Sequence, residues 1–340
     1  MKVLVVHAWL KGNLGDVLQL TVLLNALRQL QPRVLDLAGF PASPSEAVTD
    51  VLALSDRVIA DPFVWYWTST PGPMVDVWLA PRWRARRRRL FSGYDAIISA
   101  PGPFLADYDR RAPSALADIV AATELGRLVV LSSHSIGPLS PEALQVVARA
   151  SIRVAREPKT HAYLEQRGIT SVSSADLAFL YPFDRDLSPP PFPSPYRVLF
   201  LRSNNLRKRG LRIADGAVFE HEREIAPASP HPIVLATSDR RRDAGFITSA
   251  ARRLGVPAVV CRNVPELVRL IAGASEVVSD RYHPAICGAV LGKPTRVLPN
   301  REPHKMGGLS ALLEHRSVGE LQDAARAGVS ALHDALRAIA

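Results

Sequence analysis

The polar sequence Ser-Asp-Arg-Tyr-His at 279–283 holds the residue types in this chain that are best suited to chemistry. It follows a short apolar run, and Pro284 stands where the first turn of a helix would begin. Arg281 and His283 should then lie at the carboxyl end of a strand, beside a helix N-terminus. Such an end favours an anion, arginine offers a bidentate fork, and histidine exchanges a proton near neutral pH. The elbow therefore predicts a site that binds an anion and moves a proton. The alternative is a structural elbow, in which Arg281 pairs with Asp280 and His283 caps the helix.

A second set of candidate residues, Asn13, Gly15 and Asp16, follows the apolar run 3–6. Glycine lets the backbone approach a ligand closely, and Asp16 is placed to cap a helix that we expect over 17–28. The spacing is not GxGxxG, so the turn does not predict a dinucleotide site. If the turn is functional, Asp16 suits a base for, or a hydrogen-bond acceptor from, an acceptor hydroxyl. A capped turn without a ligand is the other interpretation.

Five more candidates lie where other apolar runs end. His134 and Gly137 belong to one such turn, where a structural histidine is the more common interpretation. Arg156 and Arg202 each close a run, and Lys305 follows the last one. If they are functional, these cations would line one cleft, because they lie at neighbouring strand ends. The alternative is that Arg156 belongs to a surface patch and that Lys305 is exposed to solvent.

The elements that must position these residues are short runs rich in valine, leucine and isoleucine, separated by longer helical stretches. Near-continuous apolar runs are typical of strands buried on both faces, as in parallel sheets. The alternation predicts an α/β fold with mostly parallel, doubly wound sheets. The runs lie at 3–6, 95–99, 128–132, 152–155, 197–201, 233–236, 257–260, 276–279 and 295–298.

A proline-rich stretch near the middle of the chain suggests where one domain ends and the next begins. Five prolines fall within nine residues, which favours a stiff, extended connector. We expect an N-terminal Rossmann-like domain over 1–186, a linker at 187–196, a C-terminal Rossmann-like domain over 197–310 and a helical segment at 311–340. Two such domains facing each other across a cleft would bind ligands at the carboxyl ends of their strands.

Composition narrows the class of protein. The chain has 340 residues, a formal net charge of +10 and two cysteines, Cys261 and Cys287. Two isolated cysteines form neither a disulfide framework nor a zinc site, so we expect a reducing compartment and no metal. No apolar run resembles a signal peptide or a membrane span, which predicts a cytoplasmic protein.

The densest charge run contains six arginines within 82–89, and four of the five tryptophans lie between Trp65 and Trp83. The plain interpretation is a solvated basic helix over a small aromatic core. The functional one is a surface for an anionic membrane or a lipid diphosphate, because basic residues and tryptophan both favour that interface. It would place the protein at the inner face of a membrane. No nucleic-acid-binding signature accompanies the charge, so we expect no nucleic-acid partner.

Taken in order, these segments resemble the polysaccharide pyruvyl transferase family. The elbow is the most specific piece, and the order and spacing of the others add to it. The matching segments are Asn13-x-Gly15-Asp16, Ile136–Pro138, Arg156-Glu157, Asp176–Phe179, Ser279-x-Arg281-x-His283, Gly292-x-Pro294 and Lys305.

The resemblance implies two Rossmann-like domains arranged as in the GT-B glycosyltransferases. It also implies transfer of a pyruvyl group from phosphoenolpyruvate to a sugar, usually as a cyclic ketal on two hydroxyls. Arg156, Arg281 and Lys305 are then candidates for binding the donor, His283 is the candidate general acid, and Asp16 lies on the acceptor side. Phosphoenolpyruvate is a co-substrate, and no cofactor is expected. The acceptor sugar, whether free, lipid-linked or nucleotide-linked, stays open.

Two other functions are compatible with the sequence. A GT-B glycosyltransferase would bind a nucleotide sugar and release no phosphate from phosphoenolpyruvate. A non-catalytic binder of anionic glycolipid or nucleic acid would keep its binding when His283 is replaced.

Overall fold

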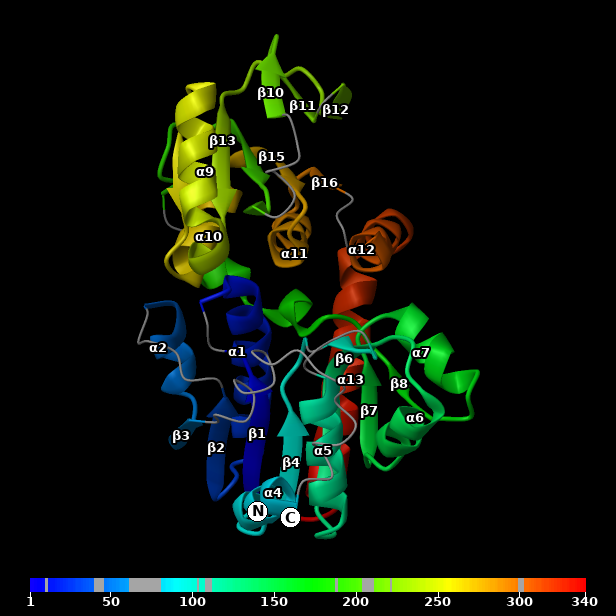
Figure 1. Ribbon diagram of the computed structural model, residues 1–340. Helices are drawn as coiled ribbons and strands as arrows, with labels where there is room; N and C mark the ends of the chain where they lie inside the picture. Colours follow the sequence, from blue (N-terminus) through cyan, green and yellow to red (C-terminus); the bar gives the residue numbers. More distant parts are fainter. Residues whose placement is uncertain are drawn as a thin grey trace.

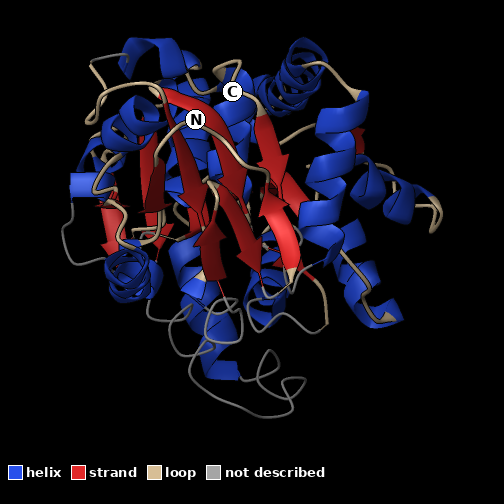
Figure 2. Ribbon diagram, turned by 90° about the horizontal axis from the view of Figure 1, so that it is seen from above, coloured by secondary structure: helices blue, strands red, loops and turns tan. Residues whose placement is uncertain are grey.

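The computed structural model describes residues 1–9, 12–39, 46–60, 81–102, 104–107, 112–186, 189–203, 211–220, 222–298 and 303–340. They form two α/β units, one above the other in Figure 1, and each is built on a parallel sheet. From above, helices lie on both sides of the strands (Figure 2). The predicted fold class is therefore confirmed.

The N-terminal unit contains the larger sheet, with the strand order β3-β2-β1-β4-β6-β7-β8 and β5 paired to β6. All of these pairs are parallel. The strands are β1 (Lys2–Ala8), β2 (Val34–Gly39), β3 (Arg57–Ala60), β4 (Ala96–Ser99), β5 (Phe104–Leu105), β6 (Leu128–Ile136), β7 (Ile152–Ala155) and β8 (Val172–Ser173).

This sheet is buried on both faces, because alternate residues of one strand supply two different cores. Val3 and Val5 of β1 belong to one apolar cluster, whereas Leu4 and Val6 belong to the other. A strand in that position has no polar face, which explains why its sequence is an unbroken apolar run.

Helices cover both faces of the N-terminal sheet, and one of them comes from the far end of the chain. In Figure 1 that helix, α13, lies beside β6, and His333 in it hydrogen-bonds the carbonyl of Ala26 with its Nε2 at 2.9 Å. The helices of this unit are α1 (Leu14–Gln29), α2 (Glu46–Leu52), α4 (Pro81–Phe91), α5 (Ala112–Thr123), α6 (Pro141–Ala148), α7 (Pro158–Glu165) and α13 (Val318–Arg337).

The C-terminal unit has a five-stranded parallel sheet in the order β14-β13-β9-β15-β16. Its strands are β9 (Tyr196–Phe200), β13 (Ile233–Thr237), β14 (Ala258–Val260), β15 (Ala274–Ser279) and β16 (Thr295–Val297). The remaining helices are α9 (Arg240–Leu254), α10 (Val264–Ala272), α11 (Tyr282–Val290) and α12 (Pro303–His315). A small antiparallel sheet of β10 (Leu211–Ala214), β11 (Ala217–Glu220) and β12 (Arg223–Ala226) lies at its outer edge, and the apolar runs did not predict it.

Two 3-10 turns, η1 (Leu177–Leu180) and η2 (Phe183–Asp186), lead from the first sheet toward the proline-rich stretch. Residues 189–195 then run into β9, and Ser194 Oγ donates to the carbonyl of Gly273 at 2.8 Å. The connector is thus hydrogen-bonded to the C-terminal unit. None of the described helices is long and apolar enough to cross a membrane.

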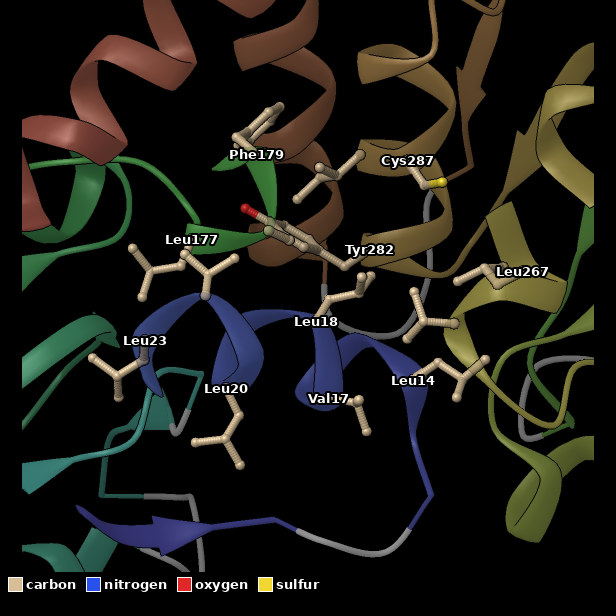
Figure 3. Close-up of a cluster of buried hydrophobic side chains, with 14 of the residues drawn as sticks. Leu14, Val17, Leu18, Leu20, Leu23, Leu177, Phe179, Leu267, Tyr282 and Cys287 are labelled. Carbon is tan, nitrogen blue, oxygen red and sulfur yellow. The ribbon is translucent and has the colours of Figure 1, made fainter. Parts of the chain in front are cut away.

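The two units share one hydrophobic core at their junction. Figure 3 shows Leu14 and Leu18 of α1 facing Leu177 of η1, Tyr282 of α11 and Leu267 of α10. All five side chains are buried within a single cluster. Burial of apolar surface contributes about 25 cal/mol per Å², so this continuous cluster holds the two units together.

Candidate functional site

The elbow at 279–283 connects β15 to α11 at the junction of the two units. Ser279 Oγ accepts the N–H of Arg281 at 3.0 Å and donates to the Arg281 carbonyl at 2.7 Å, which tightens the turn. Helix α11 begins at Tyr282, with Arg281 as its N-cap residue. His283 therefore lies in the first helical turn, one residue ahead of Pro284, where free N–H groups are expected.

Arg281 is engaged in an internal ion pair. Its Nη2 contacts Asp243, and its Nη1 is 3.5 Å from the Asp239 carboxylate, both at the start of α9. The side chain is 5% exposed, and burial, with Arg202 nearby, lowers the pKa of Arg281 to about 10. The sequence predicted that the Arg281 guanidinium either binds an anionic ligand or pairs with Asp280. It did not predict a pair with the carboxylates at the start of α9.

His283 lies between the two units. Its Nε2 is 2.8 Å from the side-chain amide of Gln19 in α1 and 3.5 Å from the carboxylate of Asp176. On its other side, Nδ1 lies so close to Gly15 that a methyl group at that position would overlap the ring. Gly15 is thus needed for the approach of helix α1 to an imidazole, whereas the sequence suggested an approach to a ligand.

Arg156 lies on the other side of the Asp176 carboxylate. Its Nη1 is 3.5 Å from Asp176, its Nη2 donates to Ser135, and its guanidinium carbon is 5.1 Å from the centre of the Tyr282 ring. Burial lowers the pKa of Arg156, but the fields of Tyr282, Glu157 and Asp176 outweigh this and raise it overall. Burial likewise raises the pKa of Asp176, and the opposing effects of His283 and Arg156 lower it overall. The carboxylate is therefore ionised at neutral pH, with the Arg156 guanidinium on one side and the His283 ring on the other.

The turn before α1 meets the C-terminal unit through its backbone. Asn13 pairs with Asp239 in an isolated antiparallel bridge, and the N–H of Leu14 donates to the Ser238 carbonyl at 3.0 Å. The prediction that Asp16 caps a helix from residue 17 is wrong. The helix begins at Leu14 and Asn13 caps it, because the Asn13 amide oxygen accepts the N–H of Gly15 while its nitrogen donates to Asp16.

His134 belongs to a different cluster, on the side of the sheet that faces α4 and α5. Strand β6 continues to Ile136, so the prediction that it ends at 132 and leaves His134 in a turn is wrong. The buried His134 ring bonds Ser132 O through Nδ1 and Ser99 Oγ through Nε2, each at 2.9 Å.

The hydrogen bonds continue from Ser99 across the sheet. Ser99 Oγ is 2.7 Å from His7 Nδ1, and His7 Nε2 is 2.9 Å from Asp118. The Asp118 carboxylate also pairs with the buried Arg87 of α4. We call His134, Ser99, His7 and Asp118 the histidine chain. Both ring nitrogens of each histidine are hydrogen-bonded, one of them to the Ser132 carbonyl, which leaves neither nitrogen open to a substrate.

The remaining predicted residues lie around the junction or outside the described part. The Arg202 N–H donates to the Asp280 carboxylate at 2.9 Å, and its charge acts on Arg281. Gly137 directly follows β6 and donates its N–H to the Leu105 carbonyl. Lys305 is in the first turn of α12, but its side chain lies outside the described residues.

Several polar residues that the sequence did not single out complete the site. Gln19 lies inside an apolar helix, and Asp239 and Asp243 start α9, so none of them follows a recognisable motif. Asp176 lies in the segment 176–179 that resembles the pyruvyl transferase family, and this resemblance was the one sequence signal for a functional role of Asp176.

The arrangement leaves buried polar atoms that have no hydrogen bond within the described residues, namely Arg156 Nε, Arg281 Nε, Gln19 Oε1 and Asp176 Oδ2. Buried polar atoms are normally satisfied, so such a concentration points to a place where polar ligands or water bind. Among the described residues, no group of histidine, cysteine and carboxylate side chains could hold a metal ion.

The sequence model of the polysaccharide pyruvyl transferase family matches residues 13–302, most of the chain. The chain belongs to this family. In this pyruvyl transferase family member, the matched region includes the first turn, Asp176 and the whole elbow. None of the curated proteins matches the chain.

Several solved structures resemble the fold of this family member, although their sequence identity to it is low. UDP-GlcNAc 2-epimerase from Neisseria meningitidis, bound to UDP-GlcNAc, has 11% identity and a TM-score of 0.54, with 99% of both chains covered. A putative UDP-N-acetylglucosamine 2-epimerase from Listeria monocytogenes has 11% identity and a TM-score of 0.54, covering 96% of this chain and 89% of its own. Anabaena Alr3699/HepE, in complex with UDP and glucose, has 14% identity and a TM-score of 0.50, covering 100% and 95%. These similarities show a GT-B-type fold.

Proposed function

We propose that this protein transfers the pyruvyl group of phosphoenolpyruvate to hydroxyls of a sugar in a glycan or glycan precursor. The observation that carries the proposal is the position of His283, held at the junction by Gln19 of one unit and flanked by the Asp176–Arg156 pair. Family membership supplies the class of reaction, and the residues supply the means to move a proton there.

His283 acts as the general acid in this scheme. It gives a proton to the methylene carbon of phosphoenolpyruvate, and a sugar hydroxyl attacks the electrophilic carbon that results. A second hydroxyl then displaces phosphate and closes the ketal. Of the two hydroxyl protons released, one restores His283 and the other leaves with phosphate. Asp176 provides a counter-ion for the imidazolium.

Gln19 suits both protonation states of His283. Its amide nitrogen donates to Nε2 when that ring nitrogen carries no proton. After the ring takes up a proton, a half-turn of the amide presents Oε1, which then accepts from Nε2–H. A side chain with both a donor and an acceptor can therefore hold the ring in place before and after the proton moves.

The donor carries a phosphate and a carboxylate, so it requires more than one cation. Arg156 and Arg281 are assigned to this role, with Arg202 and Lys305 as further donor-site candidates. The carboxylates of Asp239 and Asp243 fix the Arg281 fork, and its buried Nε has no hydrogen bond within the described residues. On the acceptor side we assign Asp16, with Asn13 and Gly15 shaping its turn.

Phosphate release from phosphoenolpyruvate tests the proposal, with free, nucleotide-linked and lipid-linked sugars offered as acceptors. We expect release with at least one acceptor, and a rate loss on the order of 10²–10⁴-fold in His283→Ala because general acid catalysis is removed. His231→Ala, in a loop of the same unit, is the control and should keep its rate.

Two outcomes would replace the proposal. Tight binding of UDP-GlcNAc without phosphate release would favour a nucleotide-sugar glycosyltransferase. No release with any acceptor, together with glycolipid binding that His283→Ala leaves intact, would favour a non-catalytic binder.

A further inference from the structure

The arginine-rich run has no part in the junction described above. Its helix, α4, lies at the end of the N-terminal unit farthest from the C-terminal unit, beside both chain termini (Figure 1). Trp65 and its neighbours up to residue 80 lie outside the described residues, as does the side chain of Trp83. The described part of the helix has exposed arginines at Arg86, Arg88 and Arg89.

A cavity of about 380 Å³ opens where α4 meets the amino ends of β1, β2 and β3. Its volume lies within the 300–1,000 Å³ typical of small-molecule sites. Val34 and Leu90 give it apolar walls, and Asp36 and Tyr94 lie among its polar lining residues.

Among the residues that line this cavity, the Asp36 carboxylate already has hydrogen-bond donors within the protein. Asp36 is 1% exposed and accepts from the Tyr94 hydroxyl at 2.5 Å and from Arg57 Nη2 at 2.6 Å. Burial raises the pKa of Tyr94 to about 12, so its hydroxyl remains a donor to Asp36 at neutral pH. Arg57 neutralises the single carboxylate among the lining residues.

Two further cations line the same cavity, and neither is neutralised. The Lys2 ammonium and the Arg89 guanidinium have no ion-pair or hydrogen-bond partner within the described part of the chain. The Asp95 carboxylate lies close by, but it accepts the backbone N–H of Lys2. With Arg57 paired to Asp36, the lining therefore carries two positive charges in excess.

We propose that this cavity binds a phosphate monoester or diester, with the phosphate between Lys2 and Arg89 and the carbon part against Val34 and Leu90. Two unpartnered cations match the charge of a phosphate monoester, and charge-assisted hydrogen bonds from arginine and lysine suit its oxygens. The apolar walls accommodate the alcohol part, which inorganic phosphate lacks. The site is at the opposite end of the sheet from the junction, so it can fail or hold independently of pyruvyl transfer.

Soluble and membrane-bound phosphate esters are distinguished by two probes. Glycerol 3-phosphate is titrated into the full chain by calorimetry, and vesicles of phosphatidylglycerol in phosphatidylcholine are sedimented with it, against pure phosphatidylcholine vesicles. The test variant is Lys2→Ala/Arg89→Ala, which removes no described contact of either side chain. The matched control, Arg252→Ala/Arg253→Ala, removes the same charge from exposed positions of α9.

We expect the test variant to bind at least tenfold more weakly than the wild type, because it loses two charge-assisted hydrogen bonds to the phosphate. The control should stay within about twofold. Loss of glycerol 3-phosphate binding assigns a soluble ester, and loss of vesicle binding alone assigns a lipid headgroup. The proposal is overturned if the wild type binds neither probe, or if test and control variants lose affinity equally.

Discussion

The two ends of the N-terminal sheet treat their cations in opposite ways. At the carboxyl ends of the strands, Arg156 is 1% exposed and shares the Asp176 carboxylate with His283. At the amino ends, Lys2 and Arg89 line a cavity and have no partner within the described residues. Burial explains the difference, because a charge removed from water must be paired whereas a solvated one need not be. The carboxyl end is therefore built to hold a fixed geometry, and the amino end retains charge for something outside the chain.

Removal of the shared carboxylate should have the largest effect. Asp176→Ala leaves the buried Arg156 without its carboxylate counter-ion, and breaking a buried pair in this way costs about 3–5 kcal/mol of unfolding free energy. Urea unfolding measures it. The control Asp334→Ala breaks an exposed pair with Arg337 and should cost no more than about 0.5 kcal/mol. If both variants lose the same unfolding free energy, burial does not explain the difference between the two ends of the sheet.

The contact between Gly15 and His283 should give the next largest effect. Gly15→Ala introduces a methyl group that overlaps the imidazole, so helix α1 or the ring must shift. Overpacking of this kind typically costs about 1–3 kcal/mol. Thermal and urea unfolding would report it, with Gly245→Ala as the control, because no atom lies within 4 Å of a methyl group there. If Gly15→Ala is as stable as the wild type, the close approach is not required.

Acid should weaken the carboxyl end through its carboxylates. The pKa of Asp176 is below its ordinary value of 3.8, so the stability it contributes is present above that value and is lost as pH falls toward the folded pKa. We expect the stability contributed by this group to decrease as the pH falls below about 4. The unfolding free energy, measured in urea at several pH values between 7 and 3, should decrease more strongly with falling pH for the wild type than for Asp176→Asn. If the unfolding free energies of the two proteins change equally with pH, the pKa of Asp176 is the same in the folded and the unfolded chain.

Replacement of the amino-end cations should have the smallest effect on stability. Lys2→Ala and Arg89→Ala remove no described pair, and surface changes of this kind usually stay within about 0.5 kcal/mol. Urea unfolding of each single variant checks this. A loss above 1 kcal/mol would show that these side chains support the fold, and the contrast with Arg156 would disappear.

The apolar runs predicted the parallel strands well because those strands are buried on both faces. All nine runs are strands in the structure. Strand β2 escaped notice because Asp36 interrupts its apolar sequence, and the partners that satisfy this carboxylate, Arg57 and Tyr94, come from other parts of the fold. Strand β6 continues through polar residues, with Ser133 at a φ of 48°, and serine-rich sequence does not indicate a buried strand.

The site was only half visible in the sequence. The elbow indicated that Arg281 and His283 are placed together, since local spacing sets that arrangement. Their partners are tertiary, because Gln19 is 264 residues from His283 and the carboxylates that hold Arg281 begin a different helix. Local sequence records which residue types stand at a strand end, but it does not record which side chains another unit brings to them.

The histidine chain has a consequence for the two rings that share Ser99. The Ser132 carbonyl and the Asp118 carboxylate can only accept, so His134 and His7 must each present an N–H to them. Two inner hydrogen bonds remain, one on each side of Ser99 Oγ, and the hydroxyl supplies only one of the two protons they need. When both rings are neutral, the hydroxyl donates to one of them and the facing nitrogen of the other has no donor. The shared hydroxyl therefore makes the two imidazoles inequivalent, although both lie against the same side chain.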